Sequence, residues 1–151
     1  MELRLEPMGT MTVYIDESWN FGNGPIGGRS CTTFTGVEWI SPSLTARSVW
    51  ANGSYVTGPE VGEPNIRILF RSDDDVLIYL DYVVRVDLPT HTVGESPAIM
   101  SGRLEVDESN PRYRWLNRTQ VVGIGQLDMQ AKTQTYDMSV LRWNGDLRPG
   151  P

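Results

Sequence analysis

The sequence of 151 residues contains a single cysteine, Cys31, and a single histidine, His91. One cysteine excludes an internal disulfide framework and is typical of a protein kept in a reducing compartment. A structural zinc ion takes about four Cys or His ligands and a catalytic zinc ion about three protein ligands, so this composition supplies neither kind of site. We therefore predict no metal site.

Long apolar runs and clusters of positive charge are also lacking. No segment approaches the roughly 20 apolar residues of a membrane-spanning helix. Residues 1–7 lack the basic and apolar regions of a secretory signal. The net charge is -6, and the basic residues are mostly arginines scattered singly along the chain. Because nucleic acids and anionic membranes attract clustered Lys and Arg, we expect neither partner and predict a soluble, cytoplasmic protein.

Almost no window places apolar residues at the three- and four-residue spacing of an amphipathic helix. Instead, 15 glycines and 10 prolines fall between short runs rich in β-branched and aromatic residues. This pattern is typical of an all-β protein, and the length is that of one domain. The sequence therefore predicts a single-domain antiparallel β-barrel with little or no helix over residues 1–143, followed by a flexible tail over residues 144–151.

The predicted strands follow one another at hairpin spacing without a long crossover helix, which favours a barrel over a parallel sheet. We expect roughly nine or ten short strands, with Asn52-Gly53 as a tight turn. A barrel of about eight strands encloses space for its own side chains or for one small ligand. The strand-like runs are 3–5, 10–15, 29–35, 36–40, 45–50, 54–56, 65–71, 76–84, 98–106, 119–127 and 132–143.

Residues 16–28 are predicted to form a long loop, since they include four glycines and Pro25 together with Trp19 and Phe21. A loop of this length in a compact domain is usually functional or mobile. Two interpretations stay open: the aromatic residues plug one end of the barrel, or the loop covers a ligand.

The predicted strand 29–35 is polar on both faces. Ser30, Thr32 and Phe34 face one side, and Arg29, Cys31 and Thr33 face the other. Such a strand is unusual in a packed core, because buried polar groups need hydrogen-bond partners. It is explained if one of its faces lines a polar cavity.

The clearest hairpin joins strands 65–71 and 76–84 through residues 72–75. Neither of its faces is wholly polar, so we expect one face to contact the barrel interior and the other a neighbouring subunit. The protein is therefore predicted to form a homo-oligomer, a dimer or larger. The acidic turn Asp73–Asp75 is interpreted as a solvated turn rather than a calcium site.

Residues 109–118 combine two aromatics, three arginines and two asparagines between a turn signal and a strand-like run. This density of hydrogen-bonding side chains is more than a scaffold requires. We expect the stretch to form the floor or the mouth of a site.

Two segments, 70–79 and 110–118 with the following 122–125, resemble the signatures of the domain-of-unknown-function family 3237. Residues 5–8 and 27–29 are similar to this family as well. The resemblance implies a calycin-like β-barrel of bacterial or fungal type, without an assigned reaction, and fungal members associated with natural-product pathways. The chain departs from the family pattern at Asp81, where a basic or amide residue is usual, and at Val37, where glycine is expected.

The glycine-rich segments 22–24 and 123–125 match neither a dinucleotide-binding nor a phosphate-binding loop, so we expect no cofactor. Within an apolar barrel, arginine and tyrosine can polarise a carbonyl group, and a desolvated carboxylate can transfer a proton near neutral pH. The candidates are Arg67 and Arg118 as electrophilic anchors, Tyr79 and Tyr113 as hydrogen-bond donors, and Asp81 or Glu38 as the acid or base.

Aromatic and arginine side chains supply a second set of candidates, for substrate binding. Trp115 and Tyr136 are predicted to hold the flat face of a substrate. The others in this set are Arg29, Trp19, Phe21 and Trp39. For every candidate the alternative is a structural ion pair or a buried core aromatic.

Three hypotheses about function follow. The first is a cofactor-independent isomerase, cyclase or lyase that acts on a small apolar or aromatic oxygenated metabolite inside the barrel. The second is a small-molecule-binding barrel without turnover, and the third is an assembly subunit whose barrel is filled by its own side chains. An enzyme requires convergent polar groups with a perturbed carboxylate, a carrier requires a roomier apolar cavity, and an assembly subunit has no cavity.

Overall fold

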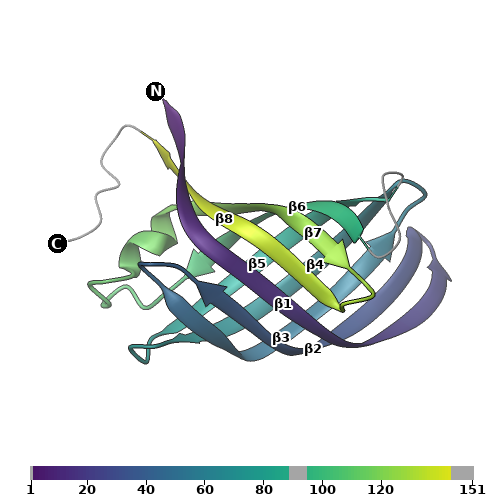
Figure 1. Cartoon of the computed structure of the whole chain (residues 1–151), viewed down its shortest axis with the longest axis horizontal. Helices are drawn as coiled ribbons and strands as arrows, with labels where there is room; N and C mark the ends of the chain where they lie inside the picture. Colours follow the sequence, from purple (N-terminus) through teal and green to yellow (C-terminus); the bar gives the residue numbers. More distant parts are fainter. Residues whose placement is uncertain (1, 89–94, 144–151) are drawn as a thin grey trace.

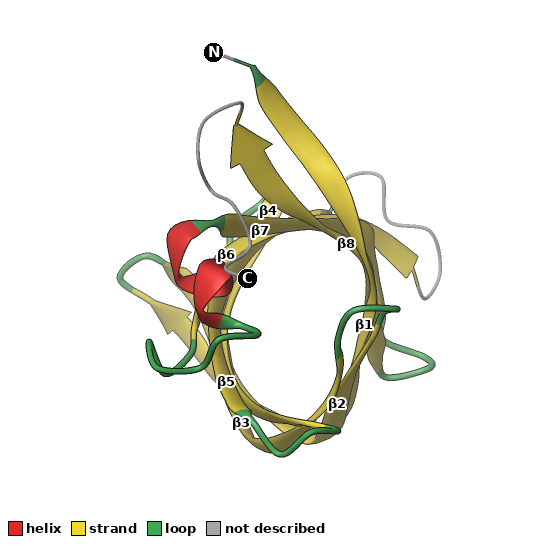
Figure 2. Ribbon diagram, turned by 90° about the vertical axis from the view of Figure 1, so that its left-hand side faces the viewer, coloured by secondary structure: helices red, strands yellow, loops and turns green. Residues whose placement is uncertain are grey.

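A computed structural model describes residues 2–88 and 95–143. Eight antiparallel strands form a closed barrel, in which each strand pairs with its neighbours in the sequence (Figure 1). Pairing of β1 with β8 closes the ring (Figure 2). The strands are β1 (Leu3–Gly24), β2 (Gly27–Ile40), β3 (Thr45–Thr57), β4 (Val61–Ser72), β5 (Leu77–Asp87), β6 (Glu95–Glu105), β7 (Gln120–Asp128) and β8 (Thr133–Trp143). The predicted all-β barrel is confirmed.

The barrel interior is built by the alternation of side chains along each strand. In β4, Ile66, Ile68 and Phe70 are buried, whereas the intervening residues face outward. Because neighbouring strands are held in register by backbone hydrogen bonds, this alternation continues around the ring. Within each regular stretch of strand, every second side chain therefore points into the core.

One half of the barrel is filled by large side chains. Trp39 is fully buried, packs edge-on against Phe70 with 6.1 Å between ring centroids, and donates its indole Nε1–H to the carbonyl oxygen of Met8 at 2.6 Å. Met11, Met100 and other apolar side chains fill the space around this pair. A buried tryptophan with a satisfied N–H adds apolar area without leaving a polar group unpaired.

The predicted loop over residues 16–28 is wrong, because β1 continues to Gly24 and β2 begins at Gly27. Irregular pairing between these strands accommodates the glycines, and Gly22 and Gly27 have positive φ angles of 93° and 119°. Glycine adopts such angles without the steric cost of a Cβ atom. The segment is thus a long β-hairpin that ends the barrel on one side.

The predicted turn at Asn52-Gly53 is also wrong, since both residues lie within β3, which pairs with β4 along its length. Gly53 packs closely, because a Cβ atom there would lie 3.0 Å from the Phe34 ring and 3.1 Å from the Ile66 side chain. The structure has eight strands because β1, β2 and β3 each join two of the expected runs. The predicted tail, residues 144–151, and His91 lie outside the described residues.

Residues 114–118 form the short 3-10 helix η1 (Arg114–Arg118), which lies beside one end of the barrel (Figure 2). In the described part of the chain, no helix is both long and apolar enough to cross a membrane.

Gly125 provides a test of how closely β7 and β8 approach. A Cβ atom added there would overlap the backbone carbonyl of Thr135, so the strands would have to move apart. We expect Gly125→Ala to lower the free energy of unfolding by about 1–3 kcal/mol, the usual cost of overpacking. Urea denaturation followed by tryptophan fluorescence measures this change.

Gly36→Ala is the matched control, because an added Cβ atom would meet no other atom within 4 Å. Its free energy of unfolding should equal or slightly exceed that of the wild type. Equal effects of the two substitutions would contradict the proposed close approach at Gly125.

Candidate functional site

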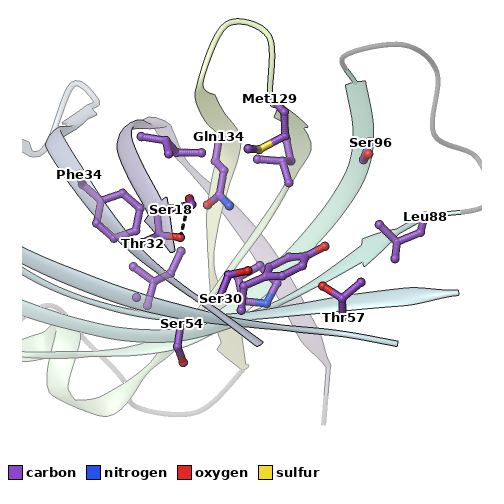
Figure 3. A pocket seen from close by; sticks show the side chains of 16 residues that line it. Ser18, Ser30, Thr32, Phe34, Ser54, Thr57, Leu88, Ser96, Met129 and Gln134 are labelled. Atoms are coloured by element: carbon purple, nitrogen blue, oxygen red, sulfur yellow. Dashed lines mark hydrogen bonds between the residues drawn. The ribbon is translucent and has the colours of Figure 1, made fainter. Parts of the chain in front are cut away.

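A cavity of about 400 Å³ opens at the end of the barrel formed by the β1–β2 hairpin (Figure 3). Its lining comes from every strand except β5, together with residues that follow β5 and β7. Leu127 of β7, Met129 of the β7–β8 turn and Gln134 of β8 contribute on one side. The remaining lining residues are Ile15, Ser18, Ser30, Thr32, Phe34, Gly53, Ser54, Tyr55, Thr57, Pro64, Ile66, Leu88 and Ser96.

The cavity exists because several side chains at this end are small. Ser30 and Thr32 of β2 and Gly53 of β3 line the cavity. Farther along β2, the inward side chain is the bulky Trp39, which is fully buried. A barrel of about eight strands has just enough interior for side chains to fill, so small residues leave room for a ligand. One face of strand 29–35 was expected to line a polar cavity, and in the structure this is the face with Ser30, Thr32 and Phe34.

Hydroxyl groups in the lining are joined to one another in pairs. The hydroxyls of Ser18 and Thr32 lie 3.1 Å apart and share a hydrogen bond (Figure 3). Partial burial raises the pKa of Tyr55, and a hydrogen bond with Thr57 opposes this shift. Gly62 makes space for the Tyr55 hydroxyl, which a Cβ atom at that position would overlap.

A buried polar pair lies at the inner side of the cavity. The Tyr136 hydroxyl donates to Oε1 of Gln134 at 3.3 Å, and both residues are buried on the inward face of β8. Burial raises the pKa of Tyr136 far above its ordinary value, so this phenol stays protonated at neutral pH. It therefore acts as a hydrogen-bond donor and never as a phenolate base under ordinary conditions.

Tyr82 packs edge-on against Tyr136, with 6.3 Å between ring centroids, and its pKa is also raised by burial. Within residues 2–88 and 95–143, the Tyr82 hydroxyl has no hydrogen-bond partner. Tyr82 is not among the residues that line the cavity. It belongs to the packed half of the barrel.

The cavity lining carries no charge in the part of the chain that the structure describes. None of the lining residues there is Asp, Glu, Lys, Arg or His. Nor do the described residues include a group of three or more His, Cys, Asp or Glu side chains that could hold a metal ion. The chemistry available from this lining is hydrogen bonding by hydroxyl and amide groups against apolar walls.

Four of the predicted catalytic residues face away from the cavity, which corrects their expected inward position. Arg67 and Tyr79 lie on the outer faces of β4 and β5, because Ile66, Ile68, Ile78 and Leu80 occupy the inward positions. Asp81, also on β5, lies 3.5 Å from Arg103, and Glu38 on β2 lies 2.7 Å from Arg47. Both carboxylates form outer-face ion pairs.

The other two predicted catalytic residues lie at the opposite end of the barrel. Arg118 contacts Glu108 at 2.9 Å, and the Tyr113 hydroxyl donates to Asp74 at 2.9 Å. Trp115, predicted to bind substrate, is stacked under the guanidinium of Arg142 at 4.3 Å. Residues 109–118 therefore form neither the mouth nor the floor of the cavity but a structural cluster around η1.

The remaining predicted binding residues divide between the core and the outer surface. Trp39 is buried in the filled half of the barrel, and Tyr136 contacts the cavity residue Gln134 without lining the cavity itself. Trp19 and Phe21 are 55% and 76% exposed on the β1–β2 hairpin. Arg29 points to the outer face of β2 and donates to Ser54 at 3.4 Å.

Sequence reasoning missed Gln134 and Tyr55 as cavity residues. Gln134 shares a predicted strand face with Tyr136 and Met138. An amide on a face of large, mainly apolar residues could have indicated a cavity residue. Tyr55 had no such signal, because its strand was predicted to be a short segment after a turn. The cavity residues come from seven strands, and only closure of the barrel brings them together.

A closed eight-stranded antiparallel barrel with a ligand-sized cavity at one end is the class of protein that the fold and the site define. The chain belongs to the family described as "Protein of unknown function (DUF3237)", which matches residues 3–141. The resemblance noted in the sequence is thereby confirmed. No curated protein matches the chain.

Solved structures similar to this chain share its fold. A β-barrel-like protein from Acinetobacter baumannii has 24% identity and a TM-score of 0.79, with 94% of this chain and 98% of that chain covered. A conserved protein of unknown function from Rhodopseudomonas palustris has 18% identity and a TM-score of 0.80, with 94% and 99% covered. An enzyme from Penicillium herquei has 13% identity and a TM-score of 0.70, with 93% and 96% covered. At these identities the likeness establishes the fold alone.

The cluster around Asp74 predicts a pH-dependent contribution to stability. Its carboxylate accepts hydrogen bonds from Ser72 at 2.6 Å, Tyr113 at 2.9 Å and Arg112 at 2.9 Å. The Ser72 bond is the largest cause that lowers the pKa of Asp74, and the Tyr113 bond and the Arg112 charge add to it. The ionised form therefore stabilises the fold above the unfolded-state pKa of about 4, and this stabilisation is lost as the pH falls through the folded-state value.

We expect Asp74→Asn to lower the free energy of unfolding at pH 7 and to differ less from the wild type as the pH falls below about 4. Urea unfolding over this pH range measures the difference. Asp73→Asn is the control, because none of the three hydrogen bonds at Asp74 involves Asp73. A difference for Asp74→Asn that does not change with pH would contradict the role of the carboxylate.

Proposed function

We propose that this protein binds a small, uncharged, mainly apolar compound with one or two oxygen atoms in the cavity at the end of its barrel. The observation that carries this proposal is the lining: hydroxyl and amide groups on apolar walls, without a charged side chain among the described residues. Burial of an unpaired charge is costly, so such walls favour a neutral ligand.

The size of the cavity supports the same conclusion. Its volume of about 400 Å³ lies near the lower end of the range of about 300–1,000 Å³ for small-molecule sites. Phe34 and Tyr55 present aromatic side chains to this space. A compact ligand with an aromatic or alicyclic ring would contact both.

A second proposal is catalysis by a cofactor-independent isomerase, cyclase or lyase in the same cavity. It is supported by the similar fold of the protein from Penicillium herquei, which is an enzyme. Since Asp81 and Glu38 form ion pairs on the outer face, catalysis here would rely on hydrogen bonds that polarise the ligand, from groups such as Gln134 and Tyr55. The cavity argues against the third hypothesis, a barrel filled by its own side chains.

Assembly into a homo-oligomer is a further proposal. Trp50, Leu69 and Tyr79 are neighbours across the outer faces of β3, β4 and β5, and Trp50 is 46% exposed. A second subunit that covered this stripe would bury apolar area on both copies. The expected cytoplasmic location and the expected lack of nucleic-acid and membrane partners stay predictions.

A substitution that fills the cavity tests ligand binding. N-phenyl-1-naphthylamine, a neutral compound that fluoresces in apolar surroundings, serves as the probe. We expect Thr32→Phe to weaken its binding at least about tenfold, about 1.4 kcal/mol, because the new ring would occupy the cavity. Fluorescence titration measures the dissociation constant.

Cys31→Phe is the matched control, because Cys31 is the exposed neighbour of Thr32 on the opposite face of β2. It should bind the probe as the wild type does. Equal binding by both variants, or no binding by the wild type, would contradict the proposed site.

The catalytic proposal has its own test. Wild type and Thr32→Phe are incubated with a panel of neutral phenols and cyclic ketones, and the products are separated by chromatography. Turnover is expected for the wild type and for Asp81→Asn, whose side chain lies outside the cavity, and is expected to be lost in Thr32→Phe. Loss of turnover in Asp81→Asn with retained folding would contradict catalysis in this cavity.

A further inference from the structure

Gln134 is the amide in the cavity lining, and it is held in a defined orientation. The residue is only 4% exposed, and its side chain extends from β8 into the cavity near Ser18 (Figure 3). A buried amide has two different ends, an oxygen that accepts hydrogen bonds and a nitrogen that donates them. Which end faces a ligand decides what kind of ligand atom it can bind.

Tyr136 fixes the oxygen end of this amide. Its hydroxyl donates to Oε1 of Gln134 at 3.3 Å, and the phenol is fully buried beside Tyr82. Because the oxygen already accepts a hydrogen bond from Tyr136, we infer that the amide nitrogen of Gln134, which lies at the same end of the side chain (Figure 3), is the group left to bind a ligand in the cavity. The pair of Gln134 and Tyr136 on β8 thus offers an N–H donor to a bound molecule.

The other polar groups at this end discriminate less. The hydroxyls of Ser18 and Thr32 bond to each other, and the Ser54 side chain points away from the cavity and accepts a hydrogen bond from Arg29 (Figure 3). A hydroxyl such as that of Ser30 can either donate or accept, so it tolerates both kinds of ligand oxygen. The amide nitrogen can only donate, which makes Gln134 the selective group.

We propose that Gln134, positioned by Tyr136, selects ligands that carry a carbonyl oxygen, such as a cyclic ketone, over ligands of equal shape that lack an acceptor. This inference rests on the proposed function and specifies its ligand class. Gln134 is the residue that contacts the ligand, and Tyr136 is a positioning residue that acts through it.

Three probes with one carbon skeleton test this selection: 1-tetralone has a carbonyl oxygen, 1-tetralol has a hydroxyl group, and tetralin has no oxygen. Their affinities are measured by displacement of N-phenyl-1-naphthylamine. We expect wild type to bind 1-tetralone about tenfold more tightly than tetralin. In Gln134→Met, which keeps the length of the side chain, this preference should disappear while the affinity for tetralin stays within about twofold.

Tyr136→Phe provides a second variant that keeps the ligand-contacting amide. Without the phenol the amide can rotate, so the preference for 1-tetralone should fall several-fold. Tyr82→Phe is the matched control, since it removes a neighbouring buried hydroxyl that has no hydrogen-bond partner in the described chain. It should keep the wild-type preference. Thermal unfolding of each variant confirms that it is folded.

The outcomes separate this inference from the proposed function. Failure of all three probes to bind the wild type would overturn the proposed function and the inference with it. Binding of tetralin and 1-tetralone with equal affinity would overturn the inference alone, as would a preference that survives in Gln134→Met. A Gln134-dependent preference for 1-tetralol over 1-tetralone would mean that the amide oxygen faces the ligand, and this too would overturn the inference.

Discussion

Closure of the barrel through the β1–β8 pairing is the constraint on which the rest of the structure depends. Once the ring is closed, every strand has one inward and one outward face, and the interior volume is fixed by strand number and tilt. Large inward residues such as Trp39 and Phe70 fill one half. Small ones such as Ser30 and Gly53 leave a cavity in the other half, so the packed core and the cavity share one enclosure.

The sequence predicted the fold correctly where the residue composition and the alternation of side chains both indicate strands. The all-β barrel, the hairpin of β4 and β5 and the family resemblance all follow from local patterns that the structure preserves. A cavity beside β2 was also expected, because this strand is polar on both faces, but the sequence did not indicate which face lines it. Each of these predictions needed only residues close together in the chain.

The site residues were harder to predict, because alternation separates two faces without saying which one is inside. On β5, Tyr79 and Asp81 share a face that includes Val83, and the opposite face contains Tyr82, so neither face is marked by polarity alone. Because the outer face of β5 also has apolar residues, it was wrongly predicted to point into the barrel. Likewise, the dense polar stretch around Tyr113 forms a structural cluster with Asp74, a residue 39 positions away in sequence that no local pattern connects to it.

The packed half of the barrel also determines how molecules can move through the protein. Trp39, Phe70 and the methionines of the core fill the barrel on the side away from the cavity beside the β1–β2 hairpin. The cavity is therefore a pocket at one end of the barrel and does not continue through the packed core. If the protein binds a ligand as proposed, entry and release would use the same opening, so a change that narrows this opening would slow both.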